Sequence, residues 1–294
     1  MITTEADIAA LLQKEQANNG AILSWSHWGD RRYPDWNGFT TALVLRALRH
    51  IPISNTSLLP IREQALDFLF QCEQPEHSGS FRFWPVNRQP DWIKIPPSAD
   101  ADDTAIYALE LARHGRLKQS ELRRIACCIL VPHRLRYVET PSPPWLRSGV
   151  FLTWLWLPKE RINIVDCCVN ANIVALLAYA GLTHLSGYQE ACGMIETAIL
   201  WAGDSWSHAR SITPFYPHPI ELRYAVEHAV ECGADLLKPS LQRLYECTWA
   251  ADESDNFSVI ERPLCGSAYS GVFWTAGNVQ IARTIGRVTV APAF

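Results

Sequence analysis

The chain alternates between two kinds of helical pattern. In the first, apolar residues recur every three or four positions and leave one face polar, as over residues 4–16 and 61–74. In the second, the segment is apolar nearly all round, as over residues 104–112 and 171–180. A helix with one apolar stripe lies at a surface, whereas a helix that is apolar on every side is surrounded by protein. We therefore expect helices of the second kind to lie inside a layer of the first.

The two patterns repeat along the chain as helical hairpins. Apolar helices are predicted to begin near residues 40, 104, 170, 220 and 272, and turns at Gly115 and Gly181 follow two of them. Such self-similarity indicates a repetitive architecture. An open solenoid would expose one side of each apolar helix, so the pattern favours a closed ring in which outer helices shield the inner ones. We expect residues 1–294 to form a single all-α domain, an α/α toroid of five to six hairpins with inner and outer rings of helices.

Composition and charge narrow the range of functions. The net charge is −4 over 294 residues and no stripe of Lys and Arg is present, which argues against a nucleic-acid partner. Residues 1–16 lack the basic start and apolar stretch of a signal peptide. The nine cysteines include no C-x-x-C pair, as is typical of buried thiols in a reducing compartment. The sequence thus predicts a cytoplasmic protein, whose contact with a membrane would be peripheral, through exposed tryptophans.

Tryptophan is the compositional anomaly, with twelve residues, many of them in predicted loops. Loop aromatics in this number are typical of a lined cavity or of wedges between repeated units. One loop that enters an apolar helix also carries the acidic run Asp100-Ala101-Asp102-Asp103. Crowded carboxylates raise the pKa of one of them, because adjacent like charges cannot all be borne at once. The run could therefore keep one carboxyl protonated, or it could only cap the helix that follows, since Asp is a preferred N-cap.

Two features resemble a known family. Gln16 followed by Gly20, and Gln74 followed by Gly79 and an aromatic residue, look like a degenerate form of the Gln-Trp repeat of terpenoid-cyclase and protein-prenyltransferase toroids. The segment 100–105 is similar to the Asp-x-Asp-Asp-Thr-Ala signature of class II terpene cyclases, including squalene–hopene cyclases.

The resemblance implies an isomerase that cyclises an isoprenoid substrate by protonating an alkene. By resemblance, Asp102 is the proton donor, and Asp100 and Asp103 assist it. Members of the class usually have two toroidal domains with the cavity between them, and this chain has the length of one. The resemblance therefore also implies that the cavity lies within one barrel mouth, or that a second copy or another partner closes it.

The carbocation that follows protonation needs a dry cavity with aromatic faces and no nucleophile. Cation–π contacts contribute roughly 2 kcal/mol or more when they are desolvated. A histidine near the acid could bond it or take the final proton, and asparagines at the same mouth could cap their helix, hold a polar group or position the acid. The candidates for these roles are Trp28, Trp36, Phe83, Trp84, Trp154, Trp156, Tyr216 and Trp274 for the wall, with His218, Asn170 and Asn172.

Other functions are compatible with the same residues. No Asp-Asp-x-x-Asp segment is present, and no Cys and His spacing is typical of zinc, so we expect no metal or cofactor unless the substrate is a diphosphate that brings magnesium. A glycan-active toroid would use Asp102 and Asp166 as an acid–base pair about 5 to 9.5 Å apart. A non-catalytic toroid that binds a lipid or a protein would leave the Asp residues solvated or merely capping.

Overall fold

Helices and one small sheet make up the part of the chain that the structure describes. The computed structural model describes residues 4–51, 56–94, 97–157, 162–251, 262–268 and 270–288. The strands are β1 (Leu23–Trp28), β2 (Arg31–Trp36), β3 (Pro263–Gly266) and β4 (Phe273–Thr275). The α-helices are α1 (Glu5–Glu15), α2 (Gly38–Ala47), α3 (Leu59–Gln71), α4 (Ala101–Arg113), α5 (Gln119–Ile125), α6 (Cys167–Tyr179), α7 (Tyr188–Ala202), α8 (Trp206–Ile212), α9 (Ile220–Glu231), α10 (Lys238–Glu246) and α11 (Gly277–Val288).

The predicted all-α toroid of five to six hairpins is wrong, because the fold contains a β-sheet. Four strands form one antiparallel sheet in the order β2-β1-β4-β3. The segments around Trp25 and Trp36, which were expected to be aromatic loops, lie in β1 and β2. Near residue 272, where a fifth apolar helix was expected, the chain instead forms β4 before it enters α11. The fold is a mixture of helices and an antiparallel sheet.

Two properties of the sheet hide it from a reading of hydrophobic periodicity. The inward positions of β1 are Ser24 and Ser26, so the alternation of buried and accessible residues is not an alternation of apolar and polar ones. The other property is the distance along the chain between paired strands: β1 pairs with β4 through Trp25 and Thr275, which no local pattern can indicate. The local evidence is the two-residue turn at Gly29, where φ is +57° and the hairpin of β1 and β2 reverses.

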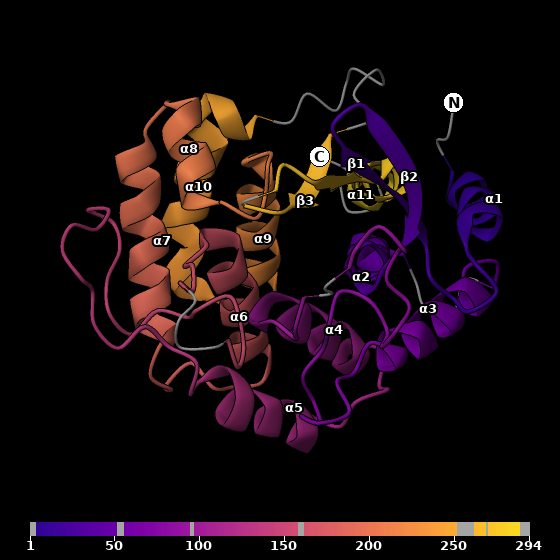
Figure 1. The fold of residues 1–294 in the computed structure, drawn as a ribbon, viewed down its shortest axis with the longest axis horizontal. Helices are drawn as coiled ribbons and strands as arrows, with labels where there is room; N and C mark the ends of the chain where they lie inside the picture. The colour runs from indigo at the N-terminus through magenta and orange to yellow at the C-terminus, as the bar shows by residue number, and fades with distance from the viewer. Residues whose placement is uncertain are drawn as a thin grey trace.

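Three of the five predicted apolar helices, α2, α4 and α6, are confirmed as buried. Every residue of α2 is buried, and so are the first eleven residues of α6. Helix α2 packs against α4 and α11, and α6 packs against α4 and α9, while α1, α3, α5, α7 and α10 lie at the periphery (Figure 1). Burial of apolar surface stabilises such packing by about 25 cal/mol per Å². Within the described ranges, no helix is both long and apolar enough to cross a bilayer.

Polar caps begin three of the central helices and so place polar groups inside the molecule. Asn37 accepts a hydrogen bond from the Thr40 N–H at 2.8 Å and begins α2. Asp100 and Asp166 begin α4 and α6 in the same way, each with extended backbone at the cap. A carboxylate or amide oxygen at this position satisfies N–H groups that have no partner within the helix.

Candidate active site

The acidic run lies in the first turn of α4 and is almost fully buried. Asp100 is the N-cap and accepts the N–H of Asp103 at 2.8 Å, so the helix begins three residues earlier than the sequence predicted. Asp102 and Asp103 follow within the first turn, and Asp102 keeps only 7% of its surface exposed. The reading of Asp102 as a merely solvated side chain is therefore wrong.

Two donors converge on the Asp102 carboxyl from outside α4. The Asn172 Nδ2 donates to Oδ1 at 2.7 Å, and the Tyr216 hydroxyl donates to Oδ2. Asn172 comes from the second turn of α6, and Tyr216 comes from the segment that precedes α9. The same Nδ2 also donates to the Tyr216 hydroxyl at 3.2 Å, which ties the two donors to each other. Tyr216 was predicted to be a wall residue, and Asn172 to cap its helix, hold a polar group or position the acid; the bond from Tyr216 to Asp102 was not predicted.

Burial raises the pKa of each carboxyl in the acidic run. It raises the pKa of Asp100 from 3.8 to about 7, with a further rise from the charge of Asp102. Burial and the charges of Asp100 and Asp102 hold the pKa of Asp103 well above its ordinary value. Burial also raises the pKa of Asp102, but the donors Tyr216 and Asn172 and the charge of Arg46 oppose that rise. Backbone N–H groups of the same helix start support the Asp100 anion, whereas side chains from other elements support the Asp102 anion.

An aromatic cluster extends from Tyr216 to the sheet; its members are Phe39, Phe83, Trp84, Tyr216 and Trp274. Phe39 lies 5.9 Å from Tyr216 and 6.0 Å from Phe83, measured between ring centroids. The Phe83 ring lies 4.6 Å from Trp84 and 5.0 Å from Trp274. Three predicted wall residues, Phe83, Trp84 and Trp274, are thus in contact with one another and, through Phe39, with the residue that bonds Asp102.

A buried acid that sequence reasoning missed holds two tryptophans of the aromatic cluster. Asp35, in β2, accepts the Trp84 Nε1–H on Oδ1 at 2.9 Å and the Trp274 Nε1–H on Oδ2 at 2.6 Å. Asn37 Nδ2 adds a third bond to Oδ2 at 3.0 Å. Burial raises the pKa of Asp35, and these donors oppose that rise. Asp35 therefore fixes the orientation of both indoles.

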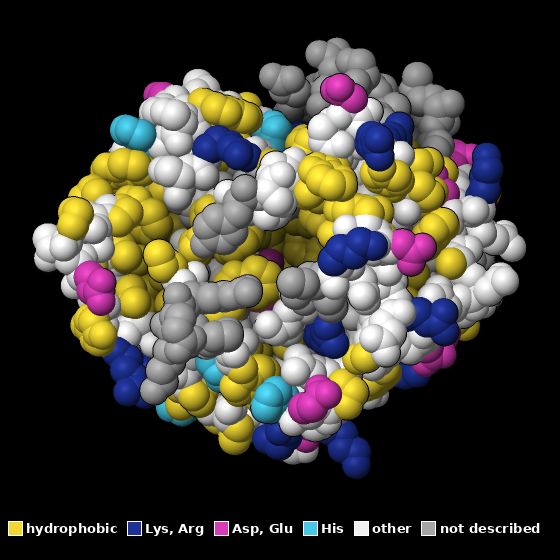
Figure 2. All heavy atoms as spheres, in the orientation of Figure 1, with side chains coloured by type: hydrophobic (Ala, Val, Ile, Leu, Met, Phe, Trp, Pro, Cys, Tyr) yellow, Lys and Arg dark blue, Asp and Glu magenta, His cyan; other side chains and the backbone are white. Residues whose placement is uncertain are grey.

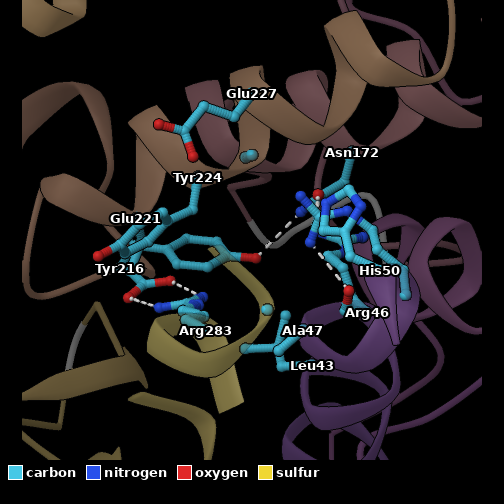
Figure 3. Close-up of a pocket in the computed structure, with 13 residues that line it drawn as sticks. Leu43, Arg46, Ala47, His50, Asn172, Tyr216, Glu221, Tyr224, Glu227 and Arg283 are labelled. Atoms are coloured by element: carbon cyan, nitrogen blue, oxygen red, sulfur yellow. Dashed lines mark hydrogen bonds and ion pairs between the residues drawn. The ribbon is translucent and has the colours of Figure 1, made fainter. Parts of the chain in front are cut away.

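The molecule is hollowed next to this region. Figure 2 shows a recess at the centre of one face, walled by hydrophobic side chains, with an acidic side chain visible at its base. A polar pocket in the molecule has a cavity volume of about 40 Å³, room for a few water molecules. Asn172 and Tyr216 line this pocket together with Arg46, Tyr224 and Arg283 (Figure 3). The two donors to Asp102 thus also border a polar space.

The other predicted wall residues have separate surroundings. Asn170 bonds the backbone of Phe151 and Asp166, which is a structural role. Trp154 meets Phe215 edge-on at 5.7 Å, and His218 meets Trp206 edge-on at 5.0 Å. Three of the predicted wall tryptophans are substantially exposed: Trp36, Trp28, which stacks on Trp92, and Trp156, which stacks on His77.

Asp166 cannot serve as the second acid of a glycan-cleaving pair in this conformation. Its Oδ1 accepts the N–H groups of Cys168 and Val169, and its Oδ2 accepts the Phe215 N–H at 2.9 Å. The residue is fully buried, so it faces no groove. Among the described residues, no three His, Cys, Asp or Glu side chains are grouped so as to hold a metal ion.

The buried Asp166 should make stability depend on pH. Burial raises its pKa from 3.8 to about 7, so the folded protein holds a proton that the unfolded chain releases between these values. Stability from this group is present at low pH and is lost as pH rises through 7. Asp166→Asn should therefore gain stability relative to the wild type between pH 5 and 8, by up to about 1.4 kcal/mol per pH unit. Urea unfolding of the wild type and of Asp166→Asn at pH 5 and at pH 8 measures this change, with the exposed Asp30→Asn as the control. The same difference in unfolding free energy between the two proteins at pH 5 and at pH 8 would contradict the prediction.

Comparison with known proteins gives only distant likenesses. No family model and no curated protein matches the chain. Among solved structures, the apo type II terpene cyclase MstE from Scytonema is 12% identical, with a TM-score of 0.46, over 97% of this chain and 96% of that one. A structure of MstE in complex with geranylgeranyl dihydroxybenzoate, its substrate, gives 12% identity and a TM-score of 0.44 over 97% and 95%. A likeness of this size does not define an activity for this chain.

Proposed function

We propose that the chain is a class II terpene cyclase-like isomerase that starts cyclisation by protonating an alkene of an isoprenoid substrate. The observation that supports this best is the Asp102 carboxyl, which is buried at a helix start and accepts hydrogen bonds from Asn172 and Tyr216. The acidic run that carries it is also the segment that resembles the signature of that class. Asp102 is the proton donor, and Asp100 and Asp103 assist.

The surroundings of Asp102 suit an acid that must be both protonated and strong. Burial favours the neutral carboxyl before the reaction, because a buried charge is costly. Once the proton has moved to the alkene carbon, the Asn172 and Tyr216 donors stabilise the carboxylate that is left. They need no reorganisation at that moment, since both bonds are already in place.

The aromatic cluster suits the cation that forms next. Phe83, Trp84 and Trp274 offer ring faces and no nucleophile, and the indole N–H groups of both tryptophans are bonded to Asp35. Electron-rich ring faces attract a carbocation in a dry site. The substrate is therefore a hydrophobic polyprenyl chain or a prenylated compound. Loss of a proton from the final cation completes the isomerisation.

The polar pocket offers a way to restore the acid. Tyr216 donates to Asp102 and also borders the pocket, which is large enough for water. A proton can pass from pocket water to the Tyr216 oxygen while the Tyr216 proton passes to Asp102. In this arrangement the cation forms on the aromatic side of Asp102, and water reaches Asp102 through Tyr216 from the side of the polar pocket.

Isotope labelling tests the proposal directly. The enzyme is incubated with farnesyl and geranylgeranyl diphosphate, squalene and prenylated aromatic acids, first in H2O and then in D2O. A protonation-initiated isomerase gives a product of unchanged mass in H2O and of one additional mass unit in D2O, because the initiating proton comes from solvent through Asp102. A non-catalytic lipid-binding protein would return every substrate unchanged, and that result would overturn the proposal.

A further inference from the structure

A buried arginine lies directly behind the donors to Asp102. Arg46, in the last turn of α2, is only 7% exposed, and its Nη1 donates to Asn172 Oδ1 at 2.9 Å. Figure 3 shows the two side chains meeting at one wall of the polar pocket. Arg46 Nε lies 3.6 Å from Oε1 of Glu110, which is itself fully buried on α4. Arg46 is thus held between an acid on one side and Asn172 on the other.

The bond from Arg46 decides which way the Asn172 amide points. Guanidinium groups only donate, so the oxygen of the amide must face Arg46 and the NH2 must face away from it. The NH2 therefore meets Asp102 Oδ1 at 2.7 Å and the Tyr216 oxygen at 3.2 Å. Because the Tyr216 oxygen accepts from Asn172, its own proton is left to bond Asp102 Oδ2. A flipped amide would set oxygen against carboxylate oxygen and NH2 against guanidinium.

Arg46 also places a positive charge near Asp102. Its charge lowers the pKa of Asp102, against the rise that burial causes. Burial lowers the pKa of Arg46 as well, and the charge of Glu110 opposes this. Arg side chains remain charged in proteins, so the positive charge persists throughout the working pH range.

We propose that Arg46 is a positioning residue, which acts through Asn172 to fix both donors to Asp102 and supports the anion that proton transfer leaves. This inference rests on the proposed function and names a part of the site that neither the motif nor the aromatic cluster contains. Arg46 touches Asn172 and not the reacting atoms, so its effect must appear in the acidity of Asp102 rather than in substrate binding.

The groups around Arg46 and Asp102 decide how a pH measurement on this site must be made. Burial and nearby arginines hold the pKa of His228, which lies 3.7 Å from Glu110, well below its ordinary value, so His228 stays neutral near pH 7. Burial raises the pKa of Cys232 to about 11. Further charged or titratable groups are Arg49 and Arg113 near His228, His50, Glu221, Tyr224, Glu227 and Arg283 along the polar pocket, and Asp100, Asp103, Tyr216, Asp166, Cys168 and Cys265 around Asp102. Of these, Asp100 and Asp166 titrate near pH 7, so the Asp102 carboxyl must be observed individually.

The test compares Arg46→Met with Arg46→Lys in pH–rate profiles of cyclisation. Arg46→Met should lower the maximal rate about 10²-fold, as expected for the loss of a preorganised donor. It should also move the basic limb of the profile about one pH unit higher, because Asp102 becomes a weaker acid once a nearby positive charge is removed. KM should stay within about twofold of the wild type, since binding groups are untouched. Arg46→Lys keeps the charge and should leave the limb near its wild-type position.

A double-mutant cycle with Asn172→Leu tests whether Arg46 acts through Asn172. The double variant should be no slower than the slower single variant, because both changes remove the same donors. Rates that multiply would overturn the proposal, and so would a slow Arg46→Met enzyme whose basic limb has not moved. Arg46→Met leaves the buried Glu110 without its arginine partner, which could itself disturb the site. The effect of Arg46→Met is therefore also measured in a Glu110→Gln background, by comparing Arg46→Met/Glu110→Gln with Glu110→Gln alone.

A titration that needs no turnover separates this inference from the proposed function. Carboxyl ¹³C shifts of labelled Asp residues, with Asp102 assigned by Asp102→Asn, report its pKa in the wild type and in the Arg46 variants. The pKa should rise in Arg46→Met and hold near the wild-type value in Arg46→Lys. An unchanged pKa in Arg46→Met would overturn the role of Arg46 even in an active cyclase. Absence of cyclised product from the wild type would instead overturn the proposed function and leave the titration result standing.

Discussion

Asp102→Asn is expected to reduce cyclisation about 10³-fold, within the range that general acids contribute. Asn is close to Asp in size, so the Tyr216 hydroxyl can still donate to the amide oxygen, and the helix start is unchanged because Asp100 supplies its cap. The amide cannot deliver the proton. Product formation from the prenyl substrate that the wild type accepts measures the effect.

Substrate binding should survive the same substitution. The aromatic cluster is linked to Asp102 by the Tyr216 hydroxyl, which Asp102→Asn leaves in place, so quenching of tryptophan fluorescence by substrate should give a Kd within about threefold of the wild type. The matched control is Asp30→Asn, an exposed change on the β1–β2 turn that should leave the rate unaltered. An Asp102→Asn enzyme that still cyclised at the wild-type rate would rule out Asp102 as the acid.

Asp35→Ala is expected to cause the largest loss of stability among single substitutions near the site, about 3–5 kcal/mol. Removing the carboxyl leaves the buried indole N–H groups of Trp84 and Trp274 without acceptors and strips Asn37 of one bond. Each buried donor that loses its partner costs about 1–3 kcal/mol. Urea unfolding followed by tryptophan fluorescence measures the loss.

Two further variants make the Asp35 result specific. Asp35→Asn keeps an oxygen for one indole but turns an NH2 toward the other, so its loss should be intermediate. Asp30→Ala, an exposed change on the same hairpin, should alter stability by less than about 0.5 kcal/mol. An Asp35→Ala protein within about 1 kcal/mol of the wild type would mean that the two indoles find other acceptors.

The sequence identifies the acid of the candidate site better than the groups that surround it. Asp102 stands out because like charges crowd at the start of a predicted helix. Asn172 and Tyr216 carry no such mark, since 70 and 114 residues separate them from Asp102 and only the fold brings them together. The helices themselves follow from local periodicity, which is why α4 and α6 are found within a few residues of their predicted positions.

Arg46 and Glu110 show which evidence the sequence did contain. Each is a charged residue within a segment that is otherwise apolar on every side, and charged side chains are almost never fully buried unless they are paired. That pattern predicts buried partners for both, although it cannot say that they partner each other. Asp35 gave no such indication, because its strand was taken for a loop and its partner Trp274 is 239 residues away.

The pairing of β1 with β4 has a consequence for how the protein is made. His27 and Thr275, which bond across these strands at 3.0 Å, are 248 residues apart, so β1 leaves the ribosome long before its neighbour exists. Contacts of such separation form slowly and leave strand edges open in the meantime. During synthesis, Asp35 can accept the Trp84 N–H but lacks its bond from Trp274 until that residue has emerged. The nascent chain therefore keeps the apolar surface that Trp274 later covers exposed until almost the whole described chain has been made.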